Sequence, residues 1–185
     1  MPRKIPVELI ENFIVVWNPP DGSELYKMGF YGKPLGIPKP KIPEFNVPLI
    51  LDLMEGLYLA EKRIIKVYEG ADRKKVSLKK MRQKAKKLYE AFDDKYAVYK
   101  DLRENGLVVT PGIKFGCDFA VYKYGPGLEH APYMVSVKKA SSEVTATDIV
   151  KAGRLATTVR KRFIIAVPDS ERNKIRYLIF KWFKA

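Results

Sequence analysis

The stretch Phe163–Val167, with the sequence FIIAV, is apolar at every position. A short run that is apolar throughout is typical of a strand whose two faces are both covered. Other runs of strand character occur in the same half of the chain, at Leu107–Thr110, Phe119–Tyr124, Tyr133–Val137 and Ile175–Phe183. The pattern predicts a mixed sheet flanked by helices, in which Phe163–Val167 is a central strand.

One helix is expected among these strands, from about Ala146 to Arg162. Thr145 and Asp148 have the spacing of a capping box at its start. Apolar side chains at helical spacing predict its buried stripe, with Leu155 beside it: Ile149, Ala152, Ala156 and Val159. Basic and polar side chains lie on the other face, where Arg154 and Lys161 would project two turns apart on the same side.

The first part of the chain predicts a smaller α/β domain. Phe13–Trp17 and Leu25–Tyr31 are interpreted as two strands joined by the turn Asn18–Gly22. Residues 48–62 carry apolar side chains at helical spacing, and the β-branched run Ile64–Tyr68 predicts a strand after them. Between these elements, the four prolines of Gly32–Pro43 predict an extended loop, either a solvated connector or an arm that contacts RNA through its lysines.

Two helices are expected to link the domains. The first begins after Ser77 and lies in a stretch, Arg73–Lys87, that holds nine basic residues. Such a helix has either a solvated face or a surface that contacts phosphates. The second extends from about Asp94 to Glu104 and ends at Asn105-Gly106. We therefore expect an α/β (mixed α+β) protein with an N-terminal domain at residues 1–88 and a C-terminal domain at residues 89–185.

Charge restricts the partners of this chain. Lys and Arg number 35 against 21 Asp and Glu, so the formal net charge is +14. Such an excess favours polyanions such as nucleic acid or an anionic membrane, although a lysine-rich solvated surface is the alternative. The apolar run Phe13–Trp17 is too short for a signal peptide or a membrane span, so we expect a cytoplasmic protein without a membrane partner. One histidine and one cysteine exclude an internal disulfide and a His/Cys zinc site within one chain.

The stretch Lys114–His130 contains the residues best suited to chemistry. His130 is the only histidine, and Tyr122 lies eight residues before it. Scission of RNA without a metal needs a base for the 2′-OH, an acid for the leaving 5′-oxygen and a cation beside the phosphorus. A histidine supplies the acid near neutral pH, and a tyrosine is a base only where positive charge lowers its pKa from about 10. Lys161 would be the cation.

A metal-dependent, restriction-like DNA nuclease is the other enzymatic interpretation. Restriction-type nucleases place an Asp on one strand, then an acidic residue, a spacer and a Lys on the next. Asp118 fits the first position, but Ser136 stands where the second carboxylate is required, two residues before Lys138. Divalent cations need several oxygen ligands, so we interpret Asp118 as a structural hydrogen-bonding residue. We still expect the mixed sheet of the C-terminal domain to be restriction-endonuclease-like in architecture.

These motifs resemble the archaeal-type tRNA-splicing endonucleases. The resemblance in the catalytic half rests on the following segments, in order: Gly112–Phe119, Val121-Tyr122, Gly125-Pro126, His130 and Val159–Lys161. In the first half, Leu25–Lys33 and Leu53–Leu59 are more loosely similar. Together they cover most of the chain.

The resemblance implies a catalytic triad, with Tyr122 as base, His130 as acid and Lys161 as the residue that stabilises the transition state. It further implies a precursor tRNA substrate with bulge-helix-bulge geometry, cleaved without metal or cofactor to a 2′,3′-cyclic phosphate and a 5′-hydroxyl. Arg154 and Arg176 stand at the positions of two arginines that clamp a bulge base.

The resemblance also implies paired subunits. Asp169 and Glu171 would enter a basic pocket of another subunit, and an ordinary turn with solvated charges is the alternative. The long loop with Lys39 and Lys41, which we expect to contact RNA, suggests a heterotetramer with a non-catalytic subunit; a homotetramer is the alternative. A further possibility is a non-catalytic RNA-binding subunit. The intact Tyr-His-Lys set argues against it, because a subunit without activity would have no need of all three residues.

Overall fold

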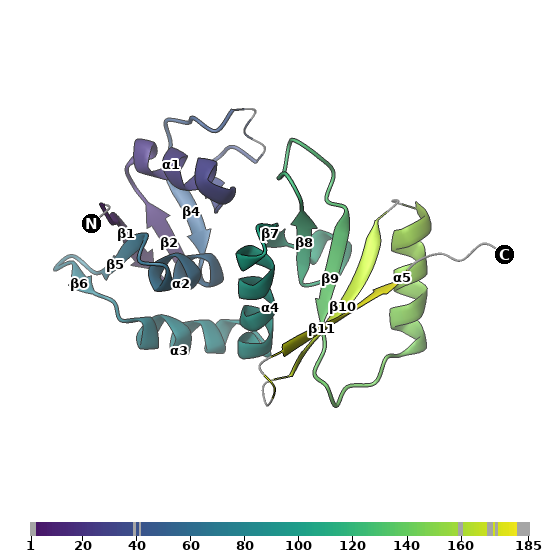
Figure 1. Cartoon of the computed structure of the whole chain (residues 1–185). Helices are drawn as coiled ribbons and strands as arrows, with labels where there is room; N and C mark the ends of the chain where they lie inside the picture. The colour runs from purple at the N-terminus through teal and green to yellow at the C-terminus, as the bar shows by residue number, and fades with distance from the viewer. Residues whose placement is uncertain are drawn as a thin grey trace. The chain divides into compact units, whose positions relative to one another are not determined.

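In a computed structural model, the chain divides into two compact units, Met1–Phe92 and Asp93–Ala185 (Figure 1). The structure describes residues 3–38, 40, 42–158, 161–169, 172 and 174–180, without the side chains of residues 151 and 155–158. Each unit has a mixed sheet with helices, so the predicted mixed α+β class is confirmed. No helix within the described residues has both the length and the apolar character needed to cross a membrane.

The first unit contains a six-stranded sheet in the order β3-β4-β2-β1-β5-β6. Its strands are β1 (Ile5–Ile10), β2 (Phe13–Val16), β3 (Lys33–Pro34), β4 (Leu49–Asp52), β5 (Ile65–Glu69) and β6 (Lys74–Lys75). Its helices are α1 (Pro19–Gly29), α2 (Leu53–Glu61) and α3 (Leu78–Leu88). β1 and β5 pair in parallel, and the other neighbours are antiparallel.

The predicted strand Leu25–Tyr31 is wrong, because these residues belong largely to helix α1. Asn18 caps this helix, and its side-chain oxygen accepts a hydrogen bond from the Asp21 N–H at 3.2 Å. Proline is well tolerated in the first turn of a helix, where its missing N–H has no partner to lose. The Asn-Pro-Pro sequence that looked like a turn is therefore the start of a helix.

Helix α2 also begins later than the apolar spacing of residues 48–62 suggests. Asp52 is its N-cap and forms a capping box with Glu55. The Asp52 side chain accepts from the Glu55 N–H at 2.8 Å, and the Glu55 side chain accepts from the Asp52 N–H at 3.1 Å. The residues before the cap form strand β4. The predictions of a strand near Ile64–Tyr68 and of a helix capped by Ser77 are confirmed.

The second unit contains a five-stranded sheet in the order β11-β10-β9-β8-β7. Its strands are β7 (Val108–Pro111), β8 (Phe119–Tyr122), β9 (Tyr133–Val137), β10 (Arg162–Asp169) and β11 (Lys174–Phe180). β9 and β10 pair in parallel, and the other neighbours are antiparallel. All five predicted strands are present within the described residues, and β10 is an interior strand whose residues Phe163–Ala166 are buried, as predicted.

A helix packs on each face of this sheet. Helix α4 (Phe92–Glu104) contacts one face, where the rings of Tyr99 and Phe119 lie 6.0 Å apart and the Tyr177 hydroxyl donates to Asp101 at 2.6 Å. Helix α5 (Ala146–Thr158) contacts the other face through Ala152, which is buried in a core cluster with Met134. The sheet flanked by helices is thus as predicted.

The predicted capping box of α5 is confirmed, but the extent of the helix is not. The Thr145 hydroxyl accepts from the Asp148 N–H at 3.2 Å, and Asp148 accepts from the Thr145 N–H at 3.0 Å. Within the described residues the helix spans Ala146–Thr158, and Arg162 is not part of it, because its N–H donates to Pro132 O as strand β10 begins. Ile149 is 56% exposed, so its assignment to the buried stripe is wrong, whereas Ala152 is buried as expected. The side chains of Leu155 and Ala156, and all of Val159, lie outside the description.

Candidate active site

The strand directions bring the three predicted catalytic residues to one end of the second sheet. β8 is antiparallel to β9, and β9 is parallel to β10, so the last residue of β8 adjoins the first residues of the other two strands. Tyr122 is the last residue of β8. His130 lies three residues before β9, and Lys161 directly precedes β10. Residues far apart in the sequence are therefore neighbours at this end, which we call the Tyr122 end.

Lys161 is fixed by the chain beside His130. Its ammonium group donates a hydrogen bond to Ala131 O at 2.8 Å and lies 4.9 Å from the centre of the Phe115 ring. Lys161 forms no ion pair with a carboxylate of the described residues. Burial lowers the pKa of Lys161 from its ordinary value, and the nearby Cys117 sulfur acts in the opposite direction. Lys161 lies in the connection before β10, not on the helix face where the spacing had placed it.

Tyr122 shares its surroundings with Lys161. It is half-buried and packs, like Phe115, against the core cluster on the α5 face of the sheet. The cluster consists of Cys117, Ala120, Ala131, Met134, Ala152, Phe163 and Ile165. Ala131 thus links the two candidates, because it belongs to the core beneath Tyr122 and its carbonyl holds the Lys161 ammonium group.

His130 is exposed at the end of a tightly bonded loop. One carboxylate oxygen of Glu129 accepts from the backbone N–H groups of Lys123 at 2.5 Å and Tyr124 at 2.6 Å. Gly125 O accepts from the Glu129 N–H at 3.2 Å, and Gly125 itself has a φ of 126°, which side chains rarely adopt. His130 therefore follows a residue held by three hydrogen bonds and precedes the residue that Lys161 contacts. Glu129 was not predicted as a site residue, and its place directly before the only histidine is the one hint of it in the sequence.

Asp118 has the structural role that its sequence context indicated. Its carboxylate accepts from the Val137 N–H at 2.8 Å and from the Lys95 ammonium group at 2.9 Å. Ser136, at the position where a metal nuclease has its second carboxylate, is buried. Within the part of the chain that the structure describes, no group of three or more His, Cys, Asp and Glu side chains is arranged to hold a metal ion.

The remaining predicted site residues lie on α5, on the hairpin of β10 and β11, or outside the description. Arg154 is exposed on α5. Arg176 lies on β11, where it is opposite Val167 of β10. The guanidinium group of Arg176 is 3.8 Å from the Asp169 carboxylate, which also accepts from the Arg172 N–H at 3.2 Å. Lys39, Lys41 and Glu171 lie outside the described residues.

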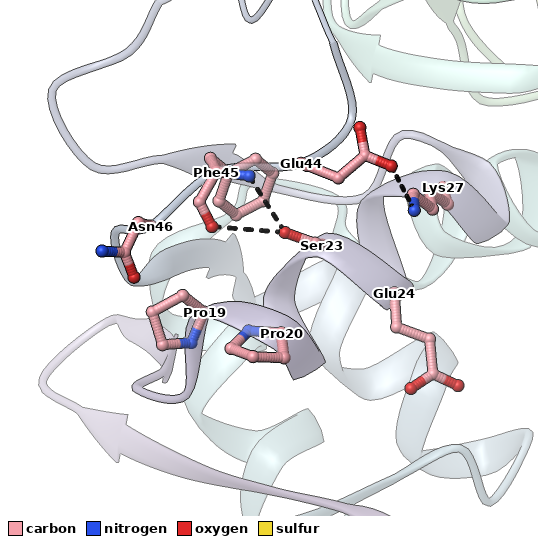
Figure 2. A pocket seen from close by; sticks show the side chains of 8 residues that line it. All are labelled: Pro19, Pro20, Ser23, Glu24, Lys27, Glu44, Phe45 and Asn46. Carbon is pink, nitrogen blue, oxygen red and sulfur yellow. Dashed lines mark hydrogen bonds and ion pairs between the residues drawn. The ribbon is translucent and has the colours of Figure 1, made fainter.

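A hollow in the first unit is occupied by structural contacts and contains none of the predicted catalytic residues (Figure 2). It lies between α1 and residues 44–46. The Ser23 hydroxyl bonds with both the N–H and the carbonyl of Phe45, at 3.2 and 3.4 Å, and Lys27 pairs with Glu44. These contacts hold the segment before β4 against α1.

Two family models match the chain on either side of the boundary between the units. The model of the tRNA intron endonuclease N-terminal domain matches residues 5–82, and that of the tRNA intron endonuclease catalytic C-terminal domain matches residues 92–177. The chain belongs to the tRNA intron endonuclease family. Tyr122, His130 and Lys161 all lie within the range matched by the catalytic domain of this family.

Individual relatives support the same assignment over nearly the whole chain. A tRNA-splicing endonuclease of Hyperthermus butylicus is 46% identical over 170 residues, which cover 92% of this chain and 93% of the relative. A tRNA-splicing endonuclease of Sulfurisphaera tokodaii is 42% identical over 178 residues, covering 96% and 98%. One from Saccharolobus islandicus is 41% identical over 177 residues, covering 95% and 97%. The similarity to the tRNA intron endonuclease family thus includes both domains.

Proposed function

We propose that this chain is the catalytic subunit of a tRNA-splicing endonuclease that cleaves precursor tRNA at the bulge-helix-bulge junctions of introns. The reaction needs no metal and leaves a 2′,3′-cyclic phosphate and a 5′-hydroxyl. The observation that carries the proposal is the convergence of Tyr122, His130 and Lys161 at one end of the second sheet. The names of the relatives support the substrate class.

Each of the three residues takes one part in a balanced transesterification. The Tyr122 oxygen, as phenolate, takes the proton of the 2′-OH, and the 2′-oxygen attacks the adjacent phosphorus. The bond from phosphorus to the 5′-oxygen breaks, and protonated His130 gives its proton to that oxygen. No water is consumed, so the ring of the cyclic phosphate and the free 5′-hydroxyl are the direct products.

Lys161 stabilises the negative charge that builds up on the phosphoryl oxygens. A lysine ammonium group has three N–H donors, and in Lys161 one of them is directed to Ala131 O. The other two are available to an anion. Because the carbonyl is neutral, the full positive charge of Lys161 remains to act on the transition state, where preorganised charge has its largest effect.

The contacts with RNA and with other subunits follow as parts of the same proposal. Arg154 and Arg176 stack on a bulge base through their guanidinium planes, and Lys39 and Lys41 contact the RNA backbone. Bulged nucleotides are suitable targets because they are already unstacked. Asp169 and Glu171 enter a basic pocket of a second subunit. The assembly is a heterotetramer with a non-catalytic subunit, or alternatively a homotetramer.

The test is cleavage of a bulge-helix-bulge RNA by the purified chain in EDTA, with the chemistry of both product ends determined. We expect a 2′,3′-cyclic phosphate and a 5′-hydroxyl. If the chain alone is inactive, a candidate non-catalytic subunit is added first and magnesium second. Activity that appears only with magnesium, or products that carry a 5′-phosphate, would refute the proposed mechanism.

A further inference from the structure

A second hollow in the first unit, of about 560 Å³, is lined by five basic side chains and by no acidic one. The basic residues are Lys4, Arg63, Lys66, Lys75 and Lys79. They come from four segments: the chain before β1, the turn between α2 and β5, strand β5, and the stretch that includes β6 and the start of α3. We call it the basic hollow. All of its lining residues belong to the first unit, so it shares none with the Tyr122 end of the second sheet.

Backbone hydrogen bonds hold these segments together. The Ile5 N–H donates to Ile64 O at 3.0 Å where β1 and β5 begin, and the Val76 N–H donates to Val67 O at 2.9 Å beside β6. Arg63 has a φ of 61°, and its N–H donates to Ala60 O at 3.0 Å in the turn after α2. The floor is formed by buried Ile65, Val67 and Val76. The segments that carry the basic residues are therefore held in fixed positions around the hollow.

The positive charges of the basic hollow are not neutralised by neighbouring acids. Other lysines nearby do have carboxylate partners, because Lys80 pairs with Glu69 and Lys74 lies 3.8 Å from Asp72. The five lining residues form no ion pair with a carboxylate among the described residues; Lys66 lies over the Tyr68 ring, 5.2 Å from its centre. Like charges gathered at one place repel each other, and an anion between them would lower that energy.

The start of helix α3 adds hydrogen-bond donors to the same place. Ser77, Leu78 and Lys79 all line the basic hollow. The Ser77 hydroxyl accepts from the Lys80 N–H at 3.2 Å, which leaves the N–H groups of Leu78 and Lys79 without an acceptor inside the helix. No acidic residue occurs in the first turn of α3, so the positive end of the helix dipole is not offset by the helix itself.

We propose that the basic hollow binds a phosphate group, carried by the backbone of an RNA substrate. Five cations and two backbone N–H groups suit the oxygens of a phosphate, and the apolar floor suits the attached sugar. The net charge of +14 favours a polyanion over a small anion. The RNA source rests on the proposed function, whereas binding of the phosphate group itself does not. A free phosphoanion is the other source of the same chemistry, and the test distinguishes the two.

The test compares two double variants of the full-length chain that lose the same charge. Lys75→Gln with Lys79→Gln changes the basic hollow, and both side chains are exposed, so the fold is retained. Lys84→Gln with Lys87→Gln removes two charges near the other end of α3 and is the control. The affinity of each for a bulge-helix-bulge RNA is measured over a series of salt concentrations. Each lost phosphate contact reduces the log–log salt slope by about 0.7 to 0.9, so we expect a reduction of that size, for one phosphate, in the hollow variant alone.

Calorimetric titration with inorganic pyrophosphate provides the second arm. Loss of RNA affinity in the hollow variant alone identifies the RNA backbone as the source. Unchanged RNA affinity with loss of pyrophosphate binding identifies a free phosphoanion, and both results support the phosphate site. Equal behaviour of the two variants in both assays would overturn it. If the wild-type protein cleaves no RNA but the hollow variant loses pyrophosphate binding, the proposed function fails and the phosphate site stands.

Discussion

The two ends of the second sheet use lysine in different ways. At the end where β9 finishes and β8 begins, Lys138 pairs with Asp148 at 3.0 Å and Lys95 pairs with Asp118 at 2.9 Å. At the Tyr122 end, Lys161 donates instead to a backbone carbonyl at 2.8 Å. All three lysines are partly buried, so exposure does not distinguish them. The three lysines differ in the charge of the group that accepts their hydrogen bond, a carboxylate at one end and a neutral carbonyl at the other.

The difference indicates which end is suited to chemistry on a phosphate. A lysine paired with a carboxylate contributes little net charge to an approaching anion, whereas one bound to a carbonyl keeps its whole charge. We call the end where β9 finishes and β8 begins the paired end, because its lysines pair with carboxylates. Asp118 and Lys138, which resemble part of a metal nuclease motif, lie at this end and make structural contacts. The four predictions below test whether chemistry belongs to the Tyr122 end and stability to the paired end.

The largest effect is expected for His130→Ala. Loss of a general acid typically costs about 10² to 10⁴ in rate, and we expect a fall of about 10³ in the single-turnover cleavage rate. His130 is exposed, so its removal should leave the fold unchanged. The rate is measured at saturating RNA, with circular dichroism as the control for folding. Cleavage at the wild-type rate would remove His130 from the mechanism.

A smaller loss, of about 10², is expected for Tyr122→Phe, because the ring that packs on the core is kept and only the hydroxyl is lost. The variant should therefore unfold at the same temperature as the wild type. Single-turnover rates across a pH series measure the effect. An undiminished rate would show that the phenol is not the base.

A change in pH dependence is expected for Lys161→Arg. Burial lowers the pKa of Lys161, so its positive charge, and with it activity, is lost as the pH rises through a value below the ordinary one for lysine. Arginine stays charged, so the variant should lose about tenfold in rate from imperfect geometry, but the ratio of its rate to the wild-type rate should rise as the pH rises through the pKa of Lys161. Rates are measured with uncatalysed RNA breakdown subtracted. The same alkaline decline in both proteins would contradict this role of Lys161.

The smallest effect on catalysis is expected for Asp148→Asn at the paired end. The Thr145 N–H, with Lys138 and the Thr145 hydroxyl, lowers the pKa of Asp148 to about 2. Because this pKa is below that of an unfolded chain, the stabilisation is present at neutral pH and is lost as the pH falls toward 2. We expect a loss of about 1 kcal/mol in the free energy of unfolding at pH 7, as for other helix caps, and less at lower pH.

Urea denaturation at pH 7 and pH 3 measures that stability difference, and cleavage by the folded variant should remain within about threefold of the wild type. A loss of activity without a loss of stability would assign the paired end a part in chemistry.

The sequence predicted the second sheet well because each strand has a short apolar or β-branched run with a clear end. It predicted the first unit less well, since Asn18-Pro19-Pro20 is equally suited to a turn and to the start of a helix. The structure shows the start of a helix, because the Asp21 N–H donates to the Asn18 side chain and the Gly22 N–H donates to Asn18 O. The start of α2 was missed for a related reason, because the strand Leu49–Asp52 continues the apolar spacing of the helix.

The candidate site was identified by residue type, but its geometry depends on tertiary contacts. The helical spacing predicted Lys161 on the helix that is now α5. In the structure, the pairing of β10 with β9 places it beside Ala131. Glu129 gave little local signal because its bonds to Lys123 and Tyr124 form only when the loop closes. The basic stretch Arg73–Lys87 was recognised from the sequence. The sequence did not show that some of its lysines line a hollow, because the other basic residues of that hollow come from distant segments: Lys4, Arg63 and Lys66.

The most direct test of the central claim compares Lys161→Ala with Lys138→Ala in EDTA. Both variants remove one partly buried lysine of the second sheet, one from each end. Single-turnover cleavage of a bulge-helix-bulge RNA is measured at saturation. We expect Lys161→Ala to lose about 10³ in rate and Lys138→Ala, once folded, to remain within about threefold. Equal losses in the two variants, or wild-type cleavage by Lys161→Ala, would contradict the account.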